Sequence, residues 1–134
     1  MAVQMPGNQE APSHRLLVES VADGPWAERL RTAWNPGAVQ APGNYVEVLQ
    51  RMGFDVDAWE TVYHHVLPGA DAVYEWMKGT ALRQVFALLD EADREAFGKA
   101  YGERLRRAYP RGGSGTVLPF RRIFFVAVRR QTPA

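Results

Sequence analysis

The sequence predicts an α/β fold in which three strands are separated by helices. Residues Phe54–Val66 alternate between apolar and polar side chains, as a strand does, and Val117–Val128 is rich in β-branched and aromatic residues. Between these runs, apolar residues recur at the three- and four-residue spacing of helices. The order strand, helices, strand, helical block, strand favours an antiparallel pair of late strands, with the helical block capping the sheet edge.

The composition is that of one ordinary globular domain. The chain has 134 residues, of which 46% are hydrophobic and 23% are charged. A net charge of +1 gives no electrostatic basis for nucleic-acid or membrane partners, and no cysteine is present for disulfides, thiolate metal sites or nucleophiles. No apolar run reaches the ~20 residues of a membrane helix, and the start lacks the features of a signal peptide. We therefore expect a cytoplasmic protein.

The first third of the chain predicts one strand and two helices. Ala2–Met5 is a short strand stopped by a proline-glycine-asparagine turn. Ser13 is expected as the N-cap of a helix that ends at Asp23. A second short helix covers Trp26–Trp34, and Asn35–Asn44 is expected to form a surface loop.

The middle of the chain predicts a helix followed directly by a long strand. The helix ends at Met52, and Gly53 stands where a glycine cap belongs. In the strand, alternation places Phe54, Val56, Ala58 and Val62 on one face. The other face carries Asp55, Asp57, Trp59, Thr61 and Tyr63. The two aspartates have no obvious acid–base partner and are assigned to the exposed side.

The last helices are expected on either side of Gly79 and after Asp90. Apolar stripes run over Val73–Met77 and Leu82–Leu89. Asp90 is the expected N-cap of a longer helix that reaches Ala108. The arginine cluster Arg104–Arg107 in its last turn is interpreted as a solvated face that complements the helix dipole.

Five motifs in order carry a family resemblance: VQMPGN, then Pro12-Ser13-His14, then VDAWET with YHH, then EWMKGTALR, and last LPFRRIFFVA. In these motifs the chain resembles the C-terminal half of the members of the trans-aconitate 2-methyltransferase family. These enzymes are class I S-adenosylmethionine-dependent methyltransferases. The resemblance implies that residues 1–134 form the C-terminal portion of a single Rossmann-like methyltransferase domain. The three strands would be its fifth to seventh, the last two antiparallel, and residues 68–110 its helical cap.

The resemblance also implies a reaction, in which a carboxylate of trans-aconitate or a related small polycarboxylic acid is esterified. A carboxylate is already an anion, so orientation toward the methyl donor is the main requirement, and no catalytic residue is assigned. The chain departs from the family pattern at three positions. The family often has proline at the positions of Gln84 and Arg121, and some relatives have glutamine at the position of His65. These departures leave the exact acid open.

The cofactor implied by the resemblance is S-adenosylmethionine, and no metal is expected. The sequence contains no G-x-G-x-x-G motif. We therefore expect cofactor binding to require an N-terminal half that is absent here, and the chain to be inactive alone. No cofactor-binding residue is identified.

The family motifs supply nine candidate substrate-binding residues: Gln4, Asn8, His14, Tyr63, His64, Trp76, Lys78, Arg83 and Arg122. Each also has an ordinary structural interpretation. A packing role is an alternative for His64 and is the favoured interpretation of Trp76. Lys78 could simply complement the dipole at the end of its helix, and Arg83 could simply be solvated. Only one of Arg121 and Arg122 can face a pocket, and the motif favours Arg122. His64 and His65 point to opposite faces, which disfavours a shared metal.

Two other functions remain open alongside the enzyme fragment. The chain could be a non-catalytic capping or interaction module, or a split-gene subunit that needs a partner chain; it could also be a small-acid-binding domain. Three strands make an unfinished sheet, and the edge at Ala2–Met5 would be exposed. We therefore expect pairing with an N-terminal half or self-association through this edge.

Overall fold

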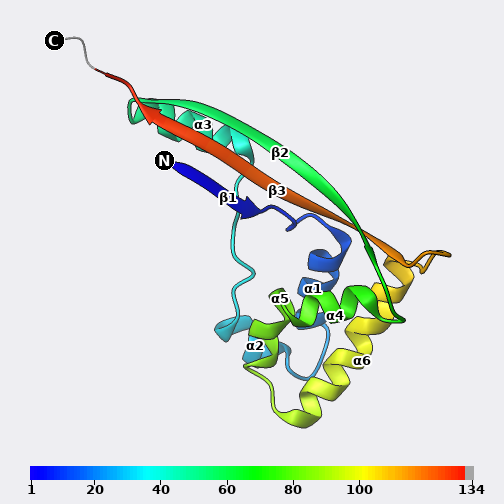
Figure 1. Cartoon of the computed structure of the whole chain (residues 1–134). Coiled ribbons are helices and arrows are strands. Elements are labelled where there is room, and N and C mark those ends of the chain that lie inside the picture. The colour runs from blue at the N-terminus through cyan, green and yellow to red at the C-terminus, as the bar shows by residue number, and fades with distance from the viewer. Residues whose placement is uncertain (132–134) are drawn as a thin grey trace. The chain divides into compact units, whose positions relative to one another are not determined.

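The computed structural model describes residues 1–131 and contains the three predicted strands (Figure 1). They are β1 (Ala2–Pro6), β2 (Phe54–Leu67) and β3 (Thr116–Arg129), and their order in the sheet is β1-β3-β2. β1 pairs antiparallel with β3, so that Ala2 lies opposite Val126 and Pro6 opposite Arg122. The arrows of β2 and β3 run in opposite directions (Figure 1), which confirms the predicted antiparallel pair.

Six helices connect these strands in the described part of the chain: α1 (Pro12–Ala22), α2 (Ala27–Ala33), α3 (Pro42–Arg51), α4 (Ala72–Lys78), α5 (Ala81–Phe86) and α6 (Glu91–Ala108). The break at Gly79 is confirmed, because it separates α4 from α5. The predicted N-cap of α6 is also confirmed, since a carboxylate oxygen of Asp90 accepts a hydrogen bond from the backbone N–H of Asp93 at 2.9 Å.

The chain divides into two compact units. The first consists of residues Met1–Asn8, Ala38–Tyr63 and the described residues from Pro119 onward; the second consists of Gln9–Gly37 and His64–Leu118. Strands β2 and β3 therefore each contribute residues to both units.

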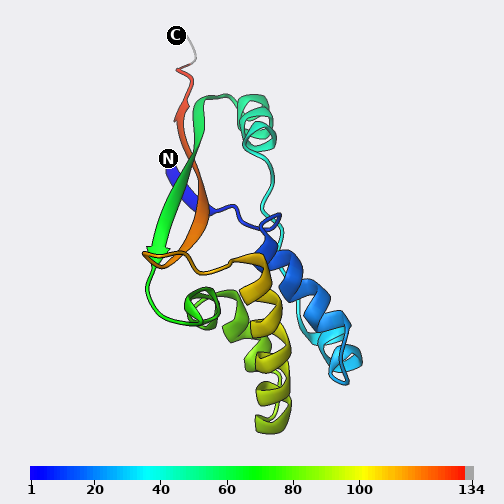
Figure 2. The ribbon, with the colours of Figure 1, turned by 90° about the vertical axis from the view of Figure 1, so that its right-hand side faces the viewer.

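The second unit is built around one hydrophobic core. Leu30, Leu82, Val85, Phe97 and Tyr101 are all fully buried there. Helix α1 packs beside α6 (Figure 2). Complete burial of side chains of this size is the main source of stability in the unit, at roughly 1.5–3 kcal/mol for each large apolar side chain.

Ser13 is not the N-cap of α1, contrary to the sequence prediction. The N-cap is Ala11, and the helix begins at Pro12, whose fixed φ and missing N–H suit a first helical position. Ser13 is instead buried inside the first turn. Its backbone N–H donates to the Tyr109 hydroxyl at 3.0 Å, and its carbonyl accepts from the Tyr101 hydroxyl at 2.8 Å. Tertiary hydrogen bonds thus replace the expected local cap.

In the first unit, β3 supplies the buried side chains Ile123, Phe125 and Ala127. The ring of Tyr45, on α3, stacks on Phe125 at a centroid distance of 5.6 Å. Helix α3 begins at Pro42, so the predicted loop over Asn35–Asn44 is three residues too long. Proline at the first helical position again marks the start.

The alternation predicted for β2 holds only over its first part. Val56 and Ala58 are more protected than their neighbours, but farther along Val62 is 48% exposed while Thr61 is half-buried. The strand has 14 residues, and the accumulated twist of so long a strand turns its faces relative to the elements that cover them. The exposure of Asp55 and Asp57 agrees with the prediction.

The arginine cluster at the end of α6 is not simply solvated, as the sequence analysis proposed. Arg104 forms an ion pair with Asp23, which follows α1, and Arg106 forms one with Asp71, just before α4, at 2.7 Å. Because the four side chains remain partly exposed, each pair contributes little stability. Their effect is to connect α6 with two other segments of the second unit.

Candidate functional site

Two of the predicted substrate residues meet on the sheet of the first unit. The Arg122 guanidinium, on β3, donates to the side-chain oxygen of Gln4 on β1, and it also lies over the Phe120 ring at 5.4 Å. The neighbouring Arg121 turns to the other side and pairs with Glu60 on β2. The structure therefore separates the two arginines as the alternation predicted, with Arg122 beside a second candidate.

Asn8 has a structural role, because both ends of its amide bond to the backbone of Arg121. The side chain is 5% exposed. Its Nδ2 donates to the Arg121 carbonyl at 3.1 Å, and its Oδ1 accepts from the Arg121 N–H at 2.8 Å. These two bonds extend the β1–β3 pairing by a side chain in place of backbone.

The candidates on β2 are exposed. Tyr63 is 42% exposed, and His64 is also exposed. Their neighbour His65 is half-buried, and its ring lies 5.1 Å from that of Trp76 on α4. Trp76 in turn packs against the core of the second unit. These contacts agree with the packing role that the sequence analysis favoured for Trp76.

Lys78 and Arg83 differ in their surroundings although both lie in the same motif. Lys78 pairs with Glu75 at 2.8 Å and lies 5.4 Å from the centre of the Tyr74 ring. The hydrogen bond to Glu75 raises the pKa of Lys78 above its ordinary value, because it favours the charged form. Arg83 is exposed, and its side chain has no partner within residues 1–131. Arg83 is therefore the candidate most available to a soluble anion.

His14 lines a cavity in the second unit, whose volume is about 160 Å³. The apolar wall consists of Leu17, Val18, Pro36 and Ala81, and the polar groups belong to Gln9, His14, Trp34 and Gln84. The His14 Nδ1 lies 3.3 Å from the Ser13 hydroxyl. Burial lowers the pKa of His14, because desolvation disfavours the imidazolium. Near neutral pH the ring is therefore uncharged.

Sequence reasoning missed the other polar residues of this cavity. Trp34 ends α2 just before an Asn-Pro-Gly turn, and its indole Nε1 is buried without a hydrogen-bond partner in the described residues. Gln84 lies on α5, 70 positions away from His14. A tryptophan directly before a turn is a signal that could have been noticed. The approach of Gln84 depends on how α5 packs, which the sequence pattern does not specify.

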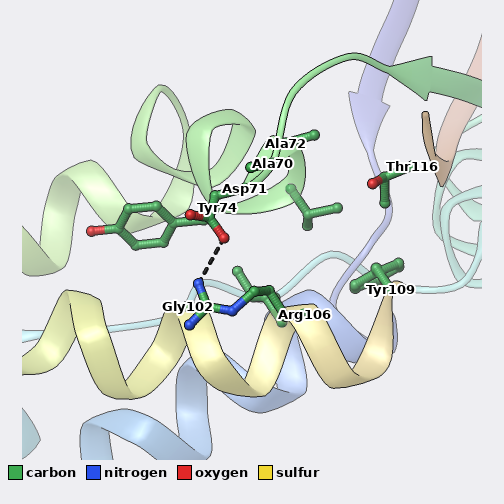
Figure 3. A pocket seen from close by; sticks show the side chains of 10 residues that line it. Ala70, Asp71, Ala72, Tyr74, Gly102, Arg106, Tyr109 and Thr116 are labelled. Atoms are coloured by element: carbon green, nitrogen blue, oxygen red, sulfur yellow. Dashed lines mark hydrogen bonds and ion pairs between the residues drawn. The ribbon is translucent and has the colours of Figure 1, made fainter. Parts of the chain in front are cut away.

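A second recess in this unit is too small to hold an organic ligand. Its lining residues come from the start of α4, from α6 and from Thr116, and the ion pair of Asp71 with Arg106 closes one side (Figure 3). The space is about 10 Å³, which is room for roughly one water molecule. This recess is therefore much smaller than the cavity that His14 lines.

The chain is similar to curated methyltransferases over nearly all of its length. It is 48% identical over 128 residues to a trans-aconitate 2-methyltransferase of Streptomyces avermitilis, 47% over 130 residues to one of Streptomyces coelicolor, and 42% over 131 residues to one of Rhodopseudomonas palustris. These alignments cover 95%, 95% and 96% of the chain. The chain is homologous to part of trans-aconitate 2-methyltransferase. No protein-family model matches it.

The chain spans about half the length of the curated trans-aconitate 2-methyltransferases that it matches, namely 48%, 43% and 51% of the three proteins. Coverage of half of each relative is consistent with the predicted correspondence to a C-terminal half. The resemblance stated from the sequence motifs is therefore confirmed.

A methyltransferase needs a binding site for its methyl donor, and in this class of fold such a site contains a glycine-rich turn. Gly69 lies in the turn from β2 to α4 with a φ of +95°, but no spaced glycine set accompanies it there. We therefore assign no residue of the described chain to the cofactor.

Residues 1–131 bring no three His, Asp or Glu side chains together in a cluster that could hold a metal ion. None of their helices has the length and apolar character needed to cross a membrane.

Proposed function

We propose that the chain is part of a cytoplasmic S-adenosylmethionine-dependent O-methyltransferase that esterifies a carboxylate of trans-aconitate or a related small polycarboxylic acid. The observation that carries the proposal is the similarity over 95% of the chain to relatives that bear this name, at up to 48% identity. The α/β architecture with an antiparallel end to its sheet is consistent with that assignment.

The chemistry requires binding and orientation rather than acid–base catalysis. A carboxylate carries its nucleophilic lone pair at neutral pH, so the enzyme has to hold one carboxylate in line with the donor methyl group. The other carboxylates need cationic or hydrogen-bonding partners. We propose Arg83 as one such partner because its guanidinium is exposed and has no partner in residues 1–131. Lys78 and Arg122 are further candidates, although each already has one intramolecular contact.

The proposal includes inactivity of the chain alone, because no cofactor-binding residue has been identified in it. A complementation experiment tests this. The chain is mixed with the remaining half of the Streptomyces avermitilis relative, and transfer of a labelled methyl group from S-adenosylmethionine to trans-aconitate is measured. We expect transfer by the mixture and none by either part alone.

A second candidate is a non-catalytic interaction module or a split-gene subunit that needs a partner chain. The observation in its favour is the free edge of β1, which has no strand beside it among the described residues. The same experiment separates the candidates. If sedimentation shows that the two parts associate, yet the complex transfers no methyl group while the intact relative does, the enzyme proposal is wrong and the module is supported.

A further inference from the structure

The sheet of the first unit is covered by a helix of that unit on one face only. On β3, Ile123, Phe125 and Ala127 are buried, and Tyr45 of α3 stacks on Phe125. Helix α3 lies beside this part of the sheet (Figure 2), and it is the one helix that the described residues contribute to the first unit. The opposite face of the sheet therefore has no helix of its own unit.

The opposite face carries contiguous apolar side chains. Phe124, Val126 and Val128 alternate with the buried residues of β3, so they point away from α3. The indole of Trp59, on β2, stacks on the Phe124 ring at a centroid distance of 5.4 Å and an interplanar angle of 5°. Trp59 is 44% exposed, Val126 37% and Val128 61%. We call these four side chains the open face.

The place of the open face in the sheet indicates a partner. Strand β3 is the middle strand of the three, so Phe124 and Val126 lie at the centre of the sheet rather than at its rim. Single exposed apolar residues are ordinary on a protein surface, whereas a contiguous apolar patch marks an interaction surface.

The free edge of β1 identifies the kind of partner. Gln4 lies opposite Phe124 and Ala2 opposite Val126, and paired residues point to the same side of a sheet. A strand added beside β1 would therefore extend the open face. In α/β folds with extended sheets, helices cover both faces. The chain spans about half the length of the curated relatives, so the other half of a relative is large enough to supply such strands and helices.

Acidic side chains at the rim of the open face favour a basic partner. Asp55 and Asp57 are exposed and, by alternation, point to the same side of β2 as Trp59. Asp55 pairs with Arg130 at 2.8 Å. A lysine or arginine beside the apolar stripe of a partner would complement the second carboxylate, that of Asp57. A second copy of the chain would instead bring two more carboxylates to the contact, which disfavours self-association through this face.

We propose that the open face binds an amphipathic helix from the remaining half of a trans-aconitate 2-methyltransferase. The apolar stripe of that helix lies on Trp59 and Val126, with a basic side chain near Asp57. The proposal rests on the proposed function for the identity of the partner. It goes further by naming the surface at which the two halves meet, and it requires no methyl transfer.

A single polypeptide tests the proposal. The remaining half of the Streptomyces avermitilis relative is joined in front of the chain, and hydroxyl-radical footprinting with mass spectrometry compares the oxidation rate of Trp59 in this fusion and in the chain alone. We expect Trp59 to be oxidised severalfold more slowly in the fusion. Equal rates overturn the proposal. A Trp59 rate that falls as the concentration of the chain alone rises also overturns it, because a second copy then covers the open face.

Methyl transfer by the same fusion separates this proposal from the proposed function. A fusion that protects Trp59 but transfers no methyl group to trans-aconitate supports the docking surface and counts against the proposed function. A fusion that transfers the methyl group, while Trp59 stays as reactive as in the chain alone, supports the proposed function and overturns the docking surface.

Variants of the open face provide a second measurement. Val126→Asp places a carboxylate in the middle of the proposed contact, where burial of a charge is unfavourable. It should lower the melting temperature of the fusion by several degrees and that of the chain alone by much less. Val128→Asp, at a more exposed position, replaces it if Val126→Asp prevents folding of the chain alone. Val48→Asp is the control, because Val48 is exposed on α3 in the same unit. Equal losses for the control and the open-face variants in the fusion overturn the proposal.

Discussion

The hydroxyl of Tyr101 donates a hydrogen bond to the backbone carbonyl of Ser13, 88 positions earlier in the chain, at 2.8 Å. The bond is buried, and burial raises the pKa of the Tyr101 hydroxyl, which therefore keeps its proton. It connects α6 with the first turn of α1, next to His14. The Tyr109 hydroxyl accepts from the N–H of the same serine, so two tyrosines position this turn.

Tyr101→Phe is expected to destabilise the chain by about 1–2 kcal/mol, because the Ser13 carbonyl is left buried without its donor. Urea unfolding followed by circular dichroism measures the change. Tyr45→Phe is the matched control. The Tyr45 hydroxyl accepts from the N–H of Gln40 at an exposed position, where water replaces the lost partner. An equal loss in both variants would contradict a special role for the buried bond.

Acidification is expected to destabilise the chain through His14. In the unfolded chain this histidine takes up a proton near pH 6.5, but burial lowers its pKa in the folded state. The unfolded state therefore binds more protons below pH 6.5, and the free energy of unfolding falls as the pH falls toward the folded-state pKa. His14→Gln should flatten this part of the curve of stability against pH. Identical slopes in the variant and the parent would show that His14 does not contribute.

Asn8→Ala is expected to cost about 1–3 kcal/mol in the free energy of unfolding, because it leaves the Arg121 N–H unpaired in a partly buried position, whereas the Arg121 carbonyl keeps the N–H of Gly7. Gln4→Ala, at an exposed position of β1, should cost less than about 0.5 kcal/mol. Thermal melting of both variants provides the comparison. Equal melting temperatures for the two variants would contradict this structural role of the Asn8 side chain.

Arg83→Gln tests the proposed anchor for a carboxylate. In the complemented methyltransferase assay the variant should raise the KM for trans-aconitate about tenfold, because one charge-assisted hydrogen bond to the substrate is lost. The melting temperature should not change, since the Arg83 side chain has no partner within residues 1–131. Arg31→Gln is the control, because that arginine is also exposed and pairs only with Glu28 in the same helix. Equal KM values in both variants would remove Arg83 from the site.

The sequence predicted the elements well because their signals are local. The alternation of Phe54–Val66, the aspartate cap of α6 and the glycine between α4 and α5 each depend on a few neighbouring residues. Ser13 was misread because its partners, Tyr101 and Tyr109, lie almost 90 positions or more away. No local pattern contains them.

The candidate residues show the same limit. Family motifs identified His14, but the groups that surround it come from three separate segments, and Trp34 and Gln84 were not predicted. Asn8 was predicted as a ligand because of its position at the end of a strand. The structure shows its amide bonded to the backbone of β3, a contact that its position in the sequence did not indicate. Residue type and position were sufficient to suggest chemistry, whereas the actual partners depend on tertiary packing.

The free edge of β1 leads to the last prediction. Met1 and Ala127 exchange two backbone hydrogen bonds, and the N–H of Gly7 donates to Arg121. In an antiparallel ladder, bonded pairs alternate, so residues 1, 3, 5 and 7 direct their backbone groups toward β3. The groups of Ala2 and Gln4 therefore point to the open edge, where Pro6 already lacks a donor.

Ala2→Pro is accordingly expected to remove a donor from the edge without removing a bond to β3. If β1 mediates self-association, or pairing with a remaining methyltransferase half, this variant should raise the dissociation constant severalfold, as measured by sedimentation equilibrium. Its melting temperature should stay within a few degrees of that of the parent chain. Val3→Pro is the matched control, since it removes a donor directed at β3 and should lower the melting temperature instead. A parent chain that stays monomeric and also fails to bind the remaining half would show that this edge has no partner.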